Sequence, residues 1–570
     1  MATLHSFQNE MDQIAAKQRT DIPLPDKGKA KADSAPTDDS DEREIEETIM
    51  KALLSNADQA RDLVASLITR HVGEYVFRIG LQPPRAQLFD NELIDDVGGW
   101  TGIARTEAEL DELKEKITAV VEEVGGKSSV LFKASIPTPR VSLLLRLPPL
   151  SVAQTPEVRC CVVGNVDAGK SSFLGVLTRG GLDDGRGRAR VALFRHKHEI
   201  ESGRTSSIGM EILGFGPSGE PYPSDYRPLQ RAGLQAAKIV SFSDLAGHER
   251  YLKTTLYGLT SGAPSCVILI VGGNAGLIGM SKEHLAIALA LGVPIVVCIT
   301  KIDMTPPQVL AETIKQVTKI LKSPGCRKTP VFVKSMETAV EISAAFGKNK
   351  LCPIFLVSNV TGEGLDFVRC FLNLLPPSDH DDKFRADEPL EYVVTEIWSV
   401  PYVGSVVNGI VNSGVVKTGD AILFGPDSNG NFQTTSVRSM QRKRADITRA
   451  EAGQCVSLAL KRVRKNAIRK GMVIVHKDAQ PKAVRRFEGQ VLILYHNTTL
   501  QKGYQAMLHC GAVRQTVRIV EMDAEHLRTG DRARVTFEFL SHPEFIKNGQ
   551  KMLFREGKTK AIGVILQTIA

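Results

Sequence analysis

Apolar runs alternate with helical patterns between residues 157 and 377. Five runs of apolar and β-branched residues predict buried strands, at 159–163, 239–243, 266–271, 295–299 and 354–357. The segments between them carry apolar residues at helical spacing, which is typical of parallel strands covered by helices on both faces. The pattern therefore predicts an α/β domain with a mostly parallel sheet over residues 157–377.

The pattern changes after Pro376-Pro377, where a polar stretch to about residue 387 predicts a linker. Residues 388–478 and 483–570 then carry short β runs separated by turns such as Lys417-Thr418-Gly419-Asp420. Short strands at this spacing predict two consecutive all-β modules.

Two further regions precede the α/β domain. Residues 73–150 predict a small α+β domain of unknown role, in which Thr106 and Glu109 form a capping box at the start of a helix. Residues 1–70 are charged and poor in aromatic residues, which predicts a disordered acidic tail. Within that tail, the segment 44–67 has the pattern of a helix.

Composition changes this picture only slightly. The chain has 570 residues and a formal net charge of +8, which permits an anionic partner without requiring one. Its nine cysteines include no C-x-x-C pair, so neither a zinc ribbon nor a disulfide framework is expected. No secretory signal and no bilayer-spanning run is visible, which predicts a cytoplasmic protein without a membrane partner. A monomer is the default expectation.

The first segment with a specific chemistry follows the first strand of the α/β domain. Residues 164–171 read G-N-V-D-A-G-K-S, the G-x-x-x-x-G-K-[ST] phosphate loop in a strand–turn–helix context. Backbone N–H groups of such a loop surround a triphosphate, the lysine reaches the β- and γ-phosphates, and the serine hydroxyl binds Mg²⁺. The candidate nucleotide-binding residues are Gly164, Asn165, Val166, Asp167, Ala168, Gly169, Lys170, Ser171 and Ser172.

The segment Thr300-Lys301-Ile302-Asp303 indicates which nucleotide binds. It ends an apolar strand about 130 residues after the phosphate loop. A carboxylate at Asp303 accepts hydrogen bonds from N1–H and the 2-amino group of guanine, which adenine does not offer. The aliphatic stem of Lys301 can cover the base, and the loop Ser358-Asn359-Val360 after the last strand is a second candidate base contact.

Hydrolysis is suggested by the segment Asp244-Leu245-Ala246-Gly247-His248, again directly after a strand. Asp244 is placed to hold Mg²⁺ through water, and the Gly247 N–H can approach the γ-phosphate because glycine has no Cβ. His248 is the candidate for orienting the attacking water. A hydroxyl from the preceding loop is also needed at the metal, and Thr205 is the best candidate, with Ser206 as an open alternative.

These segments together resemble the elongation factor Tu and elongation factor 1 alpha superfamily of translational GTPases. Within it, the chain resembles the family of GTP-binding protein 1 and GTP-binding protein 2, through L-F-R-H-K-H-E-I-E-S-G-R-T-S-S from Leu193, L-K-S-P-G-C-R-K from Leu321 and L-F-R-E-G-K-T-K-A-I-G from Leu553. The resemblance covers residues 158–567 with few gaps. It implies a P-loop G domain and two β-barrels, GTP hydrolysis triggered on the ribosome, and a role in translation elongation with tRNA, or in ribosome rescue and mRNA surveillance.

Two positions depart from the elongation factors. Arg204 stands in the first switch where an apolar residue is usual, and Ala168 stands in the phosphate loop where those factors carry histidine. Asp167 is retained, and the resemblance suggests that it helps to place a monovalent cation near the phosphates. An equally weighted alternative is that Asp167 hydrogen-bonds only its own loop.

Basic residues suggest where RNA would bind. Between Arg438 and Lys470 there are eleven Lys and Arg and two acidic residues, so phosphate contacts to tRNA or the ribosome are expected, with a solvated surface as the alternative. By resemblance, His509, Arg555 and Gly557 fall where the superfamily approaches the tRNA acceptor arm. A metal site at His196 and His198 is not expected, because no third ligand lies at suitable spacing.

The motifs thus predict a GTPase that uses GTP, GDP and Mg²⁺, and the resemblance implies that it works with the ribosome. The alternative is a GTP-dependent adaptor that recruits RNA-decay or rescue factors and hydrolyses GTP only to reset. A signalling switch anchored to a membrane is not expected, since neither a C-terminal prenylation cysteine nor an N-terminal Met-Gly is present.

Overall fold

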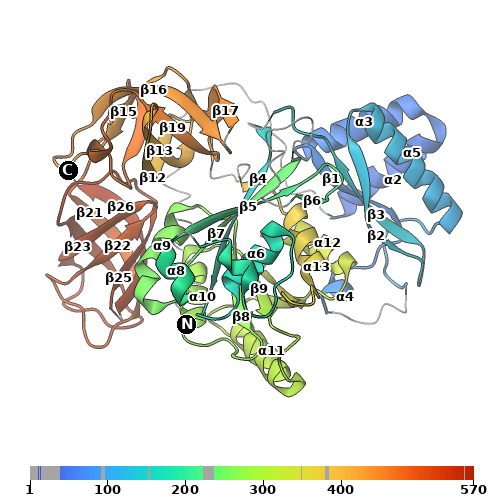
Figure 1. Ribbon diagram of the computed structural model, residues 1–570, viewed down its shortest axis with the longest axis horizontal. Coiled ribbons are helices and arrows are strands. Elements are labelled where there is room, and N and C mark those ends of the chain that lie inside the picture. The colour runs from blue at the N-terminus through green and yellow to red at the C-terminus, as the bar shows by residue number, and fades with distance from the viewer. Residues whose placement is uncertain are drawn as a thin grey trace.

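The computed structural model describes Met11, Gln13 and residues 39–90, 97–151, 154–194, 196–203, 205–222, 236–347, 350–378, 384–443, 445–557 and 559–569. Figure 1 shows four blocks: the N-terminal helices and small sheet at one end, the α/β domain in the centre, and two β domains at the other end. Arg204 and Arg444 lie outside the described residues. Within the described ranges, no helix has the length and apolarity needed to cross a bilayer.

The N-terminal block is a three-stranded antiparallel sheet in the order β1-β3-β2, packed against helices. Its elements are α2 (Asp39–Ser55), α3 (Ala57–Arg70), β1 (Glu74–Gly80), α4 (Arg85–Asp90), α5 (Glu107–Glu123), β2 (Lys127–Ala134) and β3 (Arg140–Arg146). The capping box of Thr106 and Glu109 is present at the start of α5. The helix predicted over 44–67 is found as two helices, α2 and α3.

The prediction of a disordered tail is wrong for residues 39–70. Buried apolar side chains of α2 and α3, among them Ile49, Val64 and Ile68, join those of α5 and β1 in one core. The charged composition that suggested disorder belongs to the outer faces of these amphipathic helices, while a narrow apolar stripe supplies the core. Residues 39–70 are therefore part of the small domain.

The α/β domain is built on an eight-stranded sheet in the order β10-β11-β9-β8-β4-β7-β5-β6. Its strands are β4 (Glu157–Gly164), β5 (Gly209–Phe215), β6 (Pro221–Tyr222), β7 (Lys238–Asp244), β8 (Cys266–Gly272), β9 (Ile295–Thr300), β10 (Thr329–Phe332) and β11 (Leu351–Leu356). The five predicted strands are confirmed as β4, β7, β8, β9 and β11. The sheet is parallel except for β5 and β6, which pair antiparallel at one edge.

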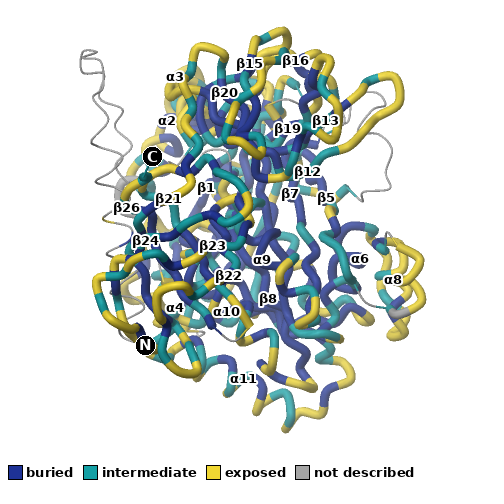
Figure 2. Tube along the Cα trace, turned by 90° about the vertical axis from the view of Figure 1, so that its left-hand side faces the viewer, coloured by how far each residue is buried: buried dark blue, intermediate teal, exposed yellow. Residues whose placement is uncertain are grey.

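Helices cover both faces of this sheet, and separate apolar clusters fill the two sides. The helices are α6 (Lys170–Arg179), α7 (Arg188–Val191), α8 (Lys197–Ser202), α9 (Leu252–Ser261), α10 (Met280–Leu291), α11 (Pro307–Lys322), α12 (Met336–Ala345) and α13 (Leu365–Leu374). Figure 2 shows the sheet as the buried centre of the molecule, with the exposed segments at its periphery. The carboxyl ends of the parallel strands thus carry the loops that form the site.

Buried ion pairs fix the small domain to the α/β domain. Arg78 of β1 pairs with Glu341 of α12 at 2.6 Å, and Arg140 of β3 forms a two-pronged pair with Glu337 of the same helix at 2.8 and 2.9 Å. Burial would raise the pKa of Glu341, but the neighbouring guanidinium groups of Arg78 and Arg85 lower it to about 2. Charges removed from water in this way require their partners, so the two domains are held in one arrangement.

The two β domains follow the α/β domain. The first contains a seven-stranded sheet in the order β15-β20-β12-β13-β19-β16-β17, and an additional pairing of β15 with β16 closes its ring. The strands of this sheet are β12 (Glu391–Val400), β13 (Gly404–Ser413), β15 (Ala421–Gly425), β16 (Gln433–Arg442), β17 (Ala445–Ile447), β19 (Cys455–Leu460) and β20 (Val473–His476), while β14 (Val415–Lys417) and β18 (Arg449–Glu451) form a separate pair. The predicted β-barrel architecture is confirmed here.

The second β domain is a closed six-stranded barrel in the order β21-β24-β23-β22-β25-β26. Its strands are β21 (Arg486–Tyr495), β22 (Gln505–Cys510), β23 (Val513–Met522), β24 (Arg532–Phe539), β25 (Lys551–Glu556) and β26 (Thr559–Ile569). Phe487, Phe537 and Phe554 pack inside it together with aliphatic residues of all six strands. Closure removes the open strand edges that a sheet of this size would otherwise expose.

The basic segment between Arg438 and Lys470 divides into two parts. Arg442 is buried, and it donates with Lys443 to the Thr155 carbonyl at 3.2 and 3.1 Å, so these two residues join the first β domain to the α/β domain. The expectation that they contact RNA phosphate is therefore wrong for this arrangement of domains. Other basic residues of the segment are exposed, among them the cluster Lys461, Arg462, Arg464 and Lys465 after β19.

Candidate functional site

The phosphate loop begins where β4 ends. Gly164 has φ +151°, and a Cβ at this position would lie 2.3 Å from the Ile270 carbonyl oxygen, so only glycine fits beside β8. Gly169 has φ +88° and starts α6 at Lys170. The loop thus turns tightly and directs the first backbone N–H groups of α6 into the pocket, as anion binding at a helix start requires.

Two side chains of α10 hold this loop, and the sequence analysis missed both. The Gly164 N–H donates to Nδ1 of His284 at 3.2 Å, and the Asn165 N–H donates to the Ser281 hydroxyl at 2.9 Å. Burial, with a smaller effect of the Lys170 charge, lowers the pKa of His284 to about 4, so the ring is neutral and Nδ1 can accept. Both residues lie more than one hundred positions after the loop, which leaves no local signal in the sequence.

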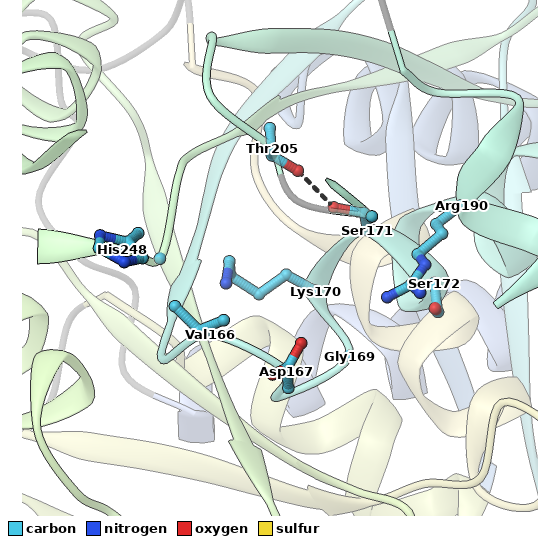
Figure 3. A pocket seen from close by; sticks show the side chains of 11 residues that line it. Val166, Asp167, Gly169, Lys170, Ser171, Ser172, Arg190, Thr205 and His248 are labelled. Atoms are coloured by element: carbon cyan, nitrogen blue, oxygen red, sulfur yellow. Dashed lines mark hydrogen bonds between the residues drawn. The ribbon is translucent and has the colours of Figure 1, made fainter. Parts of the chain in front are cut away.

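Lys170 is buried beneath the loop, and its ammonium donates to the Asn165 carbonyl at 2.8 Å. Burial lowers the pKa of this amine, and the nearby carboxylates of Asp244 and Asp167 oppose the effect. In Figure 3 the ammonium lies in the middle of the cavity, between the loop and the segment that carries His248. Among the described residues neither carboxylate forms an ion pair with the amine, so a phosphate placed there would supply a direct counter-charge.

Three predicted metal ligands come together at the start of α6. The Ser171 hydroxyl donates to Oδ2 of Asp244 at 2.7 Å and lies 2.9 Å from the Thr205 hydroxyl oxygen, which itself lies 3.4 Å from Oδ2. The other carboxylate oxygen of Asp244 is buried without a hydrogen-bond partner among the described residues, and burial raises the pKa of this carboxyl. Hard oxygen donors of this kind, with one unsatisfied, fit Mg²⁺.

The structure separates Thr205 from its neighbour Ser206, which the sequence leaves as alternatives. Ser206 donates through its N–H and hydroxyl to Glu199 at 2.7 and 2.8 Å, and its hydroxyl oxygen lies 2.7 Å from Nε2 of His198. It is therefore engaged away from Asp244. His196 and His198 stack at 5.3 Å, and no cluster of three metal-ligating side chains occurs in the part of the chain that is described.

Gly247 packs directly against the phosphate loop. A Cβ on it would lie 2.3 Å from the Lys170 amine and 2.7 Å from the Gly164 carbonyl oxygen. His248 is half-buried and lines the same cavity, and its Nδ1 accepts from the Arg250 N–H at 3.1 Å. In the view of Figure 3 its ring points away from the Lys170 ammonium. A rotation of this side chain is needed before it can orient a water molecule beside that ammonium.

The predicted base-binding residues gather at the adjacent strand ends. The Ser358 hydroxyl donates to Asp303 Oδ1 at 2.7 Å, and the Thr300 hydroxyl donates to the Ala168 carbonyl at 2.7 Å, which ties this region to the phosphate loop. Lys301 has φ +63°, and Oδ1 of Asn359 is buried without a hydrogen-bond partner in the described ranges. The geometry places Asp303 and the Ser358-Asn359-Val360 loop side by side, as recognition of one base edge would require.

One further residue of this cavity has no counterpart in the sequence analysis. The cavity is lined by the phosphate loop, Gly203, Thr205, Gly247, His248 and also Arg190 of α7. No motif in the sequence marks an arginine that could assist phosphate chemistry. Arg190 lies between α6 and the first switch, in a segment that matches no known nucleotide-binding motif.

Two of the residues that resemblance assigns to tRNA contact are occupied elsewhere. His509 is buried, and burial lowers its pKa to about 4. Arg555 forms an ion pair with Glu283 of α10, and Lys560 lies 3.2 Å from the same carboxylate. In this arrangement of domains His509 and Arg555 are not free to meet RNA. Gly557 is exposed at the turn between β25 and β26.

Comparison with protein families agrees with this architecture. The family models described as Elongation factor Tu GTP binding domain, Elongation factor Tu domain 2 and Elongation factor Tu C-terminal domain match residues 155–397, 404–475 and 480–569. GTP-binding protein 1 of Xenopus laevis is 49% identical over 421 residues, which are 72% of this chain and 64% of that protein. GTP-binding protein 2 of Mus musculus is 41% identical over 502 residues, 86% of this chain and 81% of that protein.

Solved structures share the fold. The GTPase-like domain of Saccharomyces cerevisiae Ski7, bound to GTP, gives a TM-score of 0.54 at 15% identity over 72% of this chain and 97% of that one. A bacterial selenocysteine-specific elongation factor gives 0.52 at 20% identity over 71% and 58%. With its G domain and two β domains in the same order, the chain belongs to the elongation factor Tu and elongation factor 1-alpha family of translational GTPases, in the group of GTP-binding proteins 1 and 2.

Proposed function

We propose that this protein binds GTP with Mg²⁺, hydrolyses it in a cycle coupled to the ribosome, and binds tRNA in the GTP state. The observation that carries the proposal is the meeting of three segments at one point. Thr205 of the first switch and Asp244 of the second both contact Ser171 of the phosphate loop, beside the buried Lys170 amine. A γ-phosphate bound at this point would hold both switches to the phosphate loop, and its loss on hydrolysis would release them.

The roles of the residues follow from where they lie. The phosphate loop and Lys170 hold the phosphates, Asp303 accepts from the guanine edge beside Ser358, and Gly247 lets the second switch approach the γ-phosphate. Ser171, Thr205 and, through water, Asp244 would hold Mg²⁺, which when bound would neutralise charge on the β- and γ-phosphates. Asp167, which lines the cavity, is the candidate for placing a monovalent cation there.

His248 is proposed to position the attacking water after its ring turns toward the phosphates. Phosphoryl transfer is catalysed mainly by positioning and electrostatics, so a histidine held in the wrong rotamer makes intrinsic hydrolysis slow. A ribosome that orders the second switch would turn it inward. GTP hydrolysis would then be slow in solution and fast on the ribosome.

The proposed RNA partner is supported by the domain order and by charge. The exposed basic residues Lys461, Arg462, Arg464 and Lys465 stand on the first β domain, where salt-dependent phosphate contacts are available. A protein of similar fold is named a selenocysteine-specific elongation factor. For this chain we propose delivery of tRNA or rescue of stalled ribosomes, by a cytoplasmic monomer.

Two measurements test the proposal. Filter binding of aminoacyl-tRNA to the protein with a non-hydrolysable GTP analogue should exceed binding with GDP at least tenfold, and equal binding would favour an adaptor that recruits rescue or RNA-decay factors. In the second measurement, His248→Ala should bind GTP normally and lose hydrolysis stimulated by ribosomes. Ribosome stimulation that survives this substitution would remove His248 from the mechanism.

A further inference from the structure

Arg190 brings a second cation to the nucleotide cavity. Its side chain lines the cavity together with Lys170, Ser171, Ser172 and Thr205. Figure 3 shows the guanidinium approaching beside Ser172, on the side of the phosphate loop opposite to His248. Within the described part of the chain the guanidinium has neither a hydrogen bond nor an ion pair.

The acidic groups near Arg190 in the chain do not neutralise it. The Asp183 carboxylate accepts from the N–H groups of Gly187 and Ala189 at 3.2 and 2.9 Å, and Asp184 accepts from those of Arg186 and Arg188 at 2.9 and 3.2 Å. These carboxylates stabilise the loop backbone. Asp167 also lines the cavity but forms no ion pair with Arg190 among the described residues.

Glycines make room for the guanidinium. A Cβ at Gly187 would lie 2.5 Å from Nε of Arg190, and a Cβ at Gly203 would lie 3.2 Å from one of its terminal nitrogens. Gly187 has φ +91° and Gly203 has φ +64°, so both positions favour glycine on backbone grounds as well. The side chain thus runs between two glycines, one before α7 and one in the first switch.

The segment that carries Arg190 is fastened to the rest of the site. The Asp183 N–H donates to the Asn359 carbonyl of the proposed base loop at 2.9 Å. The Ala189 carbonyl packs onto α6, where a Cβ at Gly175 would lie 2.2 Å from it. Arg190 therefore stands on a support that contacts both the base loop and the helix of the phosphate loop, which limits the freedom of its guanidinium.

We propose that Arg190 is an internal arginine that binds the phosphates of the nucleotide and stabilises the charge that forms during hydrolysis. The inference rests on the proposed function of this pocket as a GTPase site. Two unpaired cations in one cavity repel each other, and a polyanion between them turns that repulsion into binding energy. Guanidinium groups suit phosphate oxygens because they donate two parallel hydrogen bonds.

The step that Arg190 assists is balanced within GTP and water. The water oxygen forms a bond to the γ-phosphorus while the bond from that phosphorus to the β–γ bridging oxygen breaks. The bonding electrons remain on GDP, and the water proton leaves with inorganic phosphate or solvent. Negative charge accumulates on the leaving β-phosphate, where a cation held by the protein lowers the barrier.

The test compares Arg190→Ala with Arg190→Lys, and uses Arg188→Ala as a matched control on the same short helix. Arg188 is exposed and does not line the cavity. Single-turnover GTP hydrolysis without ribosomes should fall at least tenfold in Arg190→Ala, fall less in Arg190→Lys, and stay unchanged in Arg188→Ala. A rate and nucleotide affinity of Arg190→Ala equal to those of the unaltered protein would overturn the proposal.

A second readout separates this inference from the proposed function. Affinity for a non-hydrolysable GTP analogue reports phosphate contact even if hydrolysis proves too slow to measure, and it involves neither ribosome nor tRNA. We expect Arg190→Ala to lower the affinity for the analogue about tenfold or more and to leave the melting temperature of the nucleotide-free protein unchanged. Unchanged analogue affinity together with undetectable hydrolysis by every protein would leave no phosphate role for Arg190 and would also reject the GTPase proposal. If the Arg190 variants behave as expected but the protein does not bind tRNA, only the proposed role in translation would be rejected.

Discussion

Replacing Gly247 with alanine tests the idea that the second switch closes onto the phosphate loop. The new Cβ would lie 2.3 Å from the Lys170 amine, 2.7 Å from the Gly164 carbonyl oxygen and 2.9 Å from the carbonyl carbon of Asn165. The amine can move, although it then gives up its bond to Asn165. The two backbone atoms cannot, because the bond from Gly164 to His284 and the close packing on Ile270 hold them.

The magnitude follows from this difference. Overpacking by one methyl group against fixed backbone costs about 1–3 kcal/mol, which is roughly a 5- to 150-fold change in an equilibrium constant. The cost applies only while the segment 244–248 is closed. Affinity for a non-hydrolysable GTP analogue should therefore fall within that range, whereas GDP, which does not need the closed segment, should lose less than about threefold.

The assay is a fluorescence titration with labelled nucleotides, and Gly181→Ala is the control. Gly181 also belongs to a loop beside α6, but a Cβ there meets nothing within 4 Å. Equal losses for GTP analogue and GDP would mean that alanine damages the phosphate loop itself. An unchanged affinity for both would refute the claim that Gly247 is needed for closure.

Three other substitutions probe the base loop, the support of the phosphate loop and the domain junction. Asp303→Asn should weaken GTP binding by about 1–3 kcal/mol, because an acceptor for the guanine edge is lost. In competition the variant should bind xanthosine triphosphate more tightly than GTP, the reverse of the unaltered protein; an unaltered preference for GTP would exclude Asp303 from base recognition. Burial holds the pKa of His284 at about 4 in the fold, against an ordinary value of 6.5. The stability that depends on the neutral ring is complete above pH 6.5. About 3 kcal/mol of it is lost as the pH falls from 6.5 towards 4, because the unfolded chain takes up the proton first. The loss should appear as faster hydrogen exchange at the phosphate loop at low pH. His284→Asn keeps an acceptor near the Nδ1 position but does not titrate, so it should flatten this pH dependence; a slope equal to that of the unaltered protein would count against the role of His284. Glu341→Ala removes the nearest carboxylate from the buried Arg78 and leaves it, among the described residues, only Glu46 at 3.4 Å, at a cost of up to about 3–5 kcal/mol, and should lower the melting temperature without changing GTP affinity; an unchanged melting temperature would show that the pair with Glu341 is not needed.

The sequence predicts best where local pattern and chemistry coincide. Lys170, Asp244 and Thr300 each follow or end an apolar strand, and the carboxyl ends of parallel strands meet at one edge, so the pattern alone indicates that they approach one another. The choice between Thr205 and Ser206 does not follow from the pattern, because it depends on Glu199 capturing the second hydroxyl. Both residues offer the same donor chemistry, and only their partners distinguish them.

The remaining failures concern contacts between distant segments. Helices α2 and α3 have the charged composition of a disordered tail, although the few apolar positions they carry suffice to complete a core. Arg442 belongs to a basic run of the kind that is usually exposed, yet it is buried against the α/β domain. Composition reports what a residue can do, whereas domain docking decides whether it is accessible.

Helix α10 shows how the site and the last barrel are physically joined. This helix supports the phosphate loop through Ser281 and His284, and Glu283, the residue before His284, pairs with Arg555 and Lys560 of the barrel. A rigid helix cannot move at one of these contacts without straining the other, because close-packed protein interiors are hardly compressible. A change in the phosphate loop when GTP becomes GDP would therefore be felt at the ion pairs of Glu283. The same pairs now occupy Arg555, which resemblance assigns to tRNA, so loosening them would free that guanidinium for another anion.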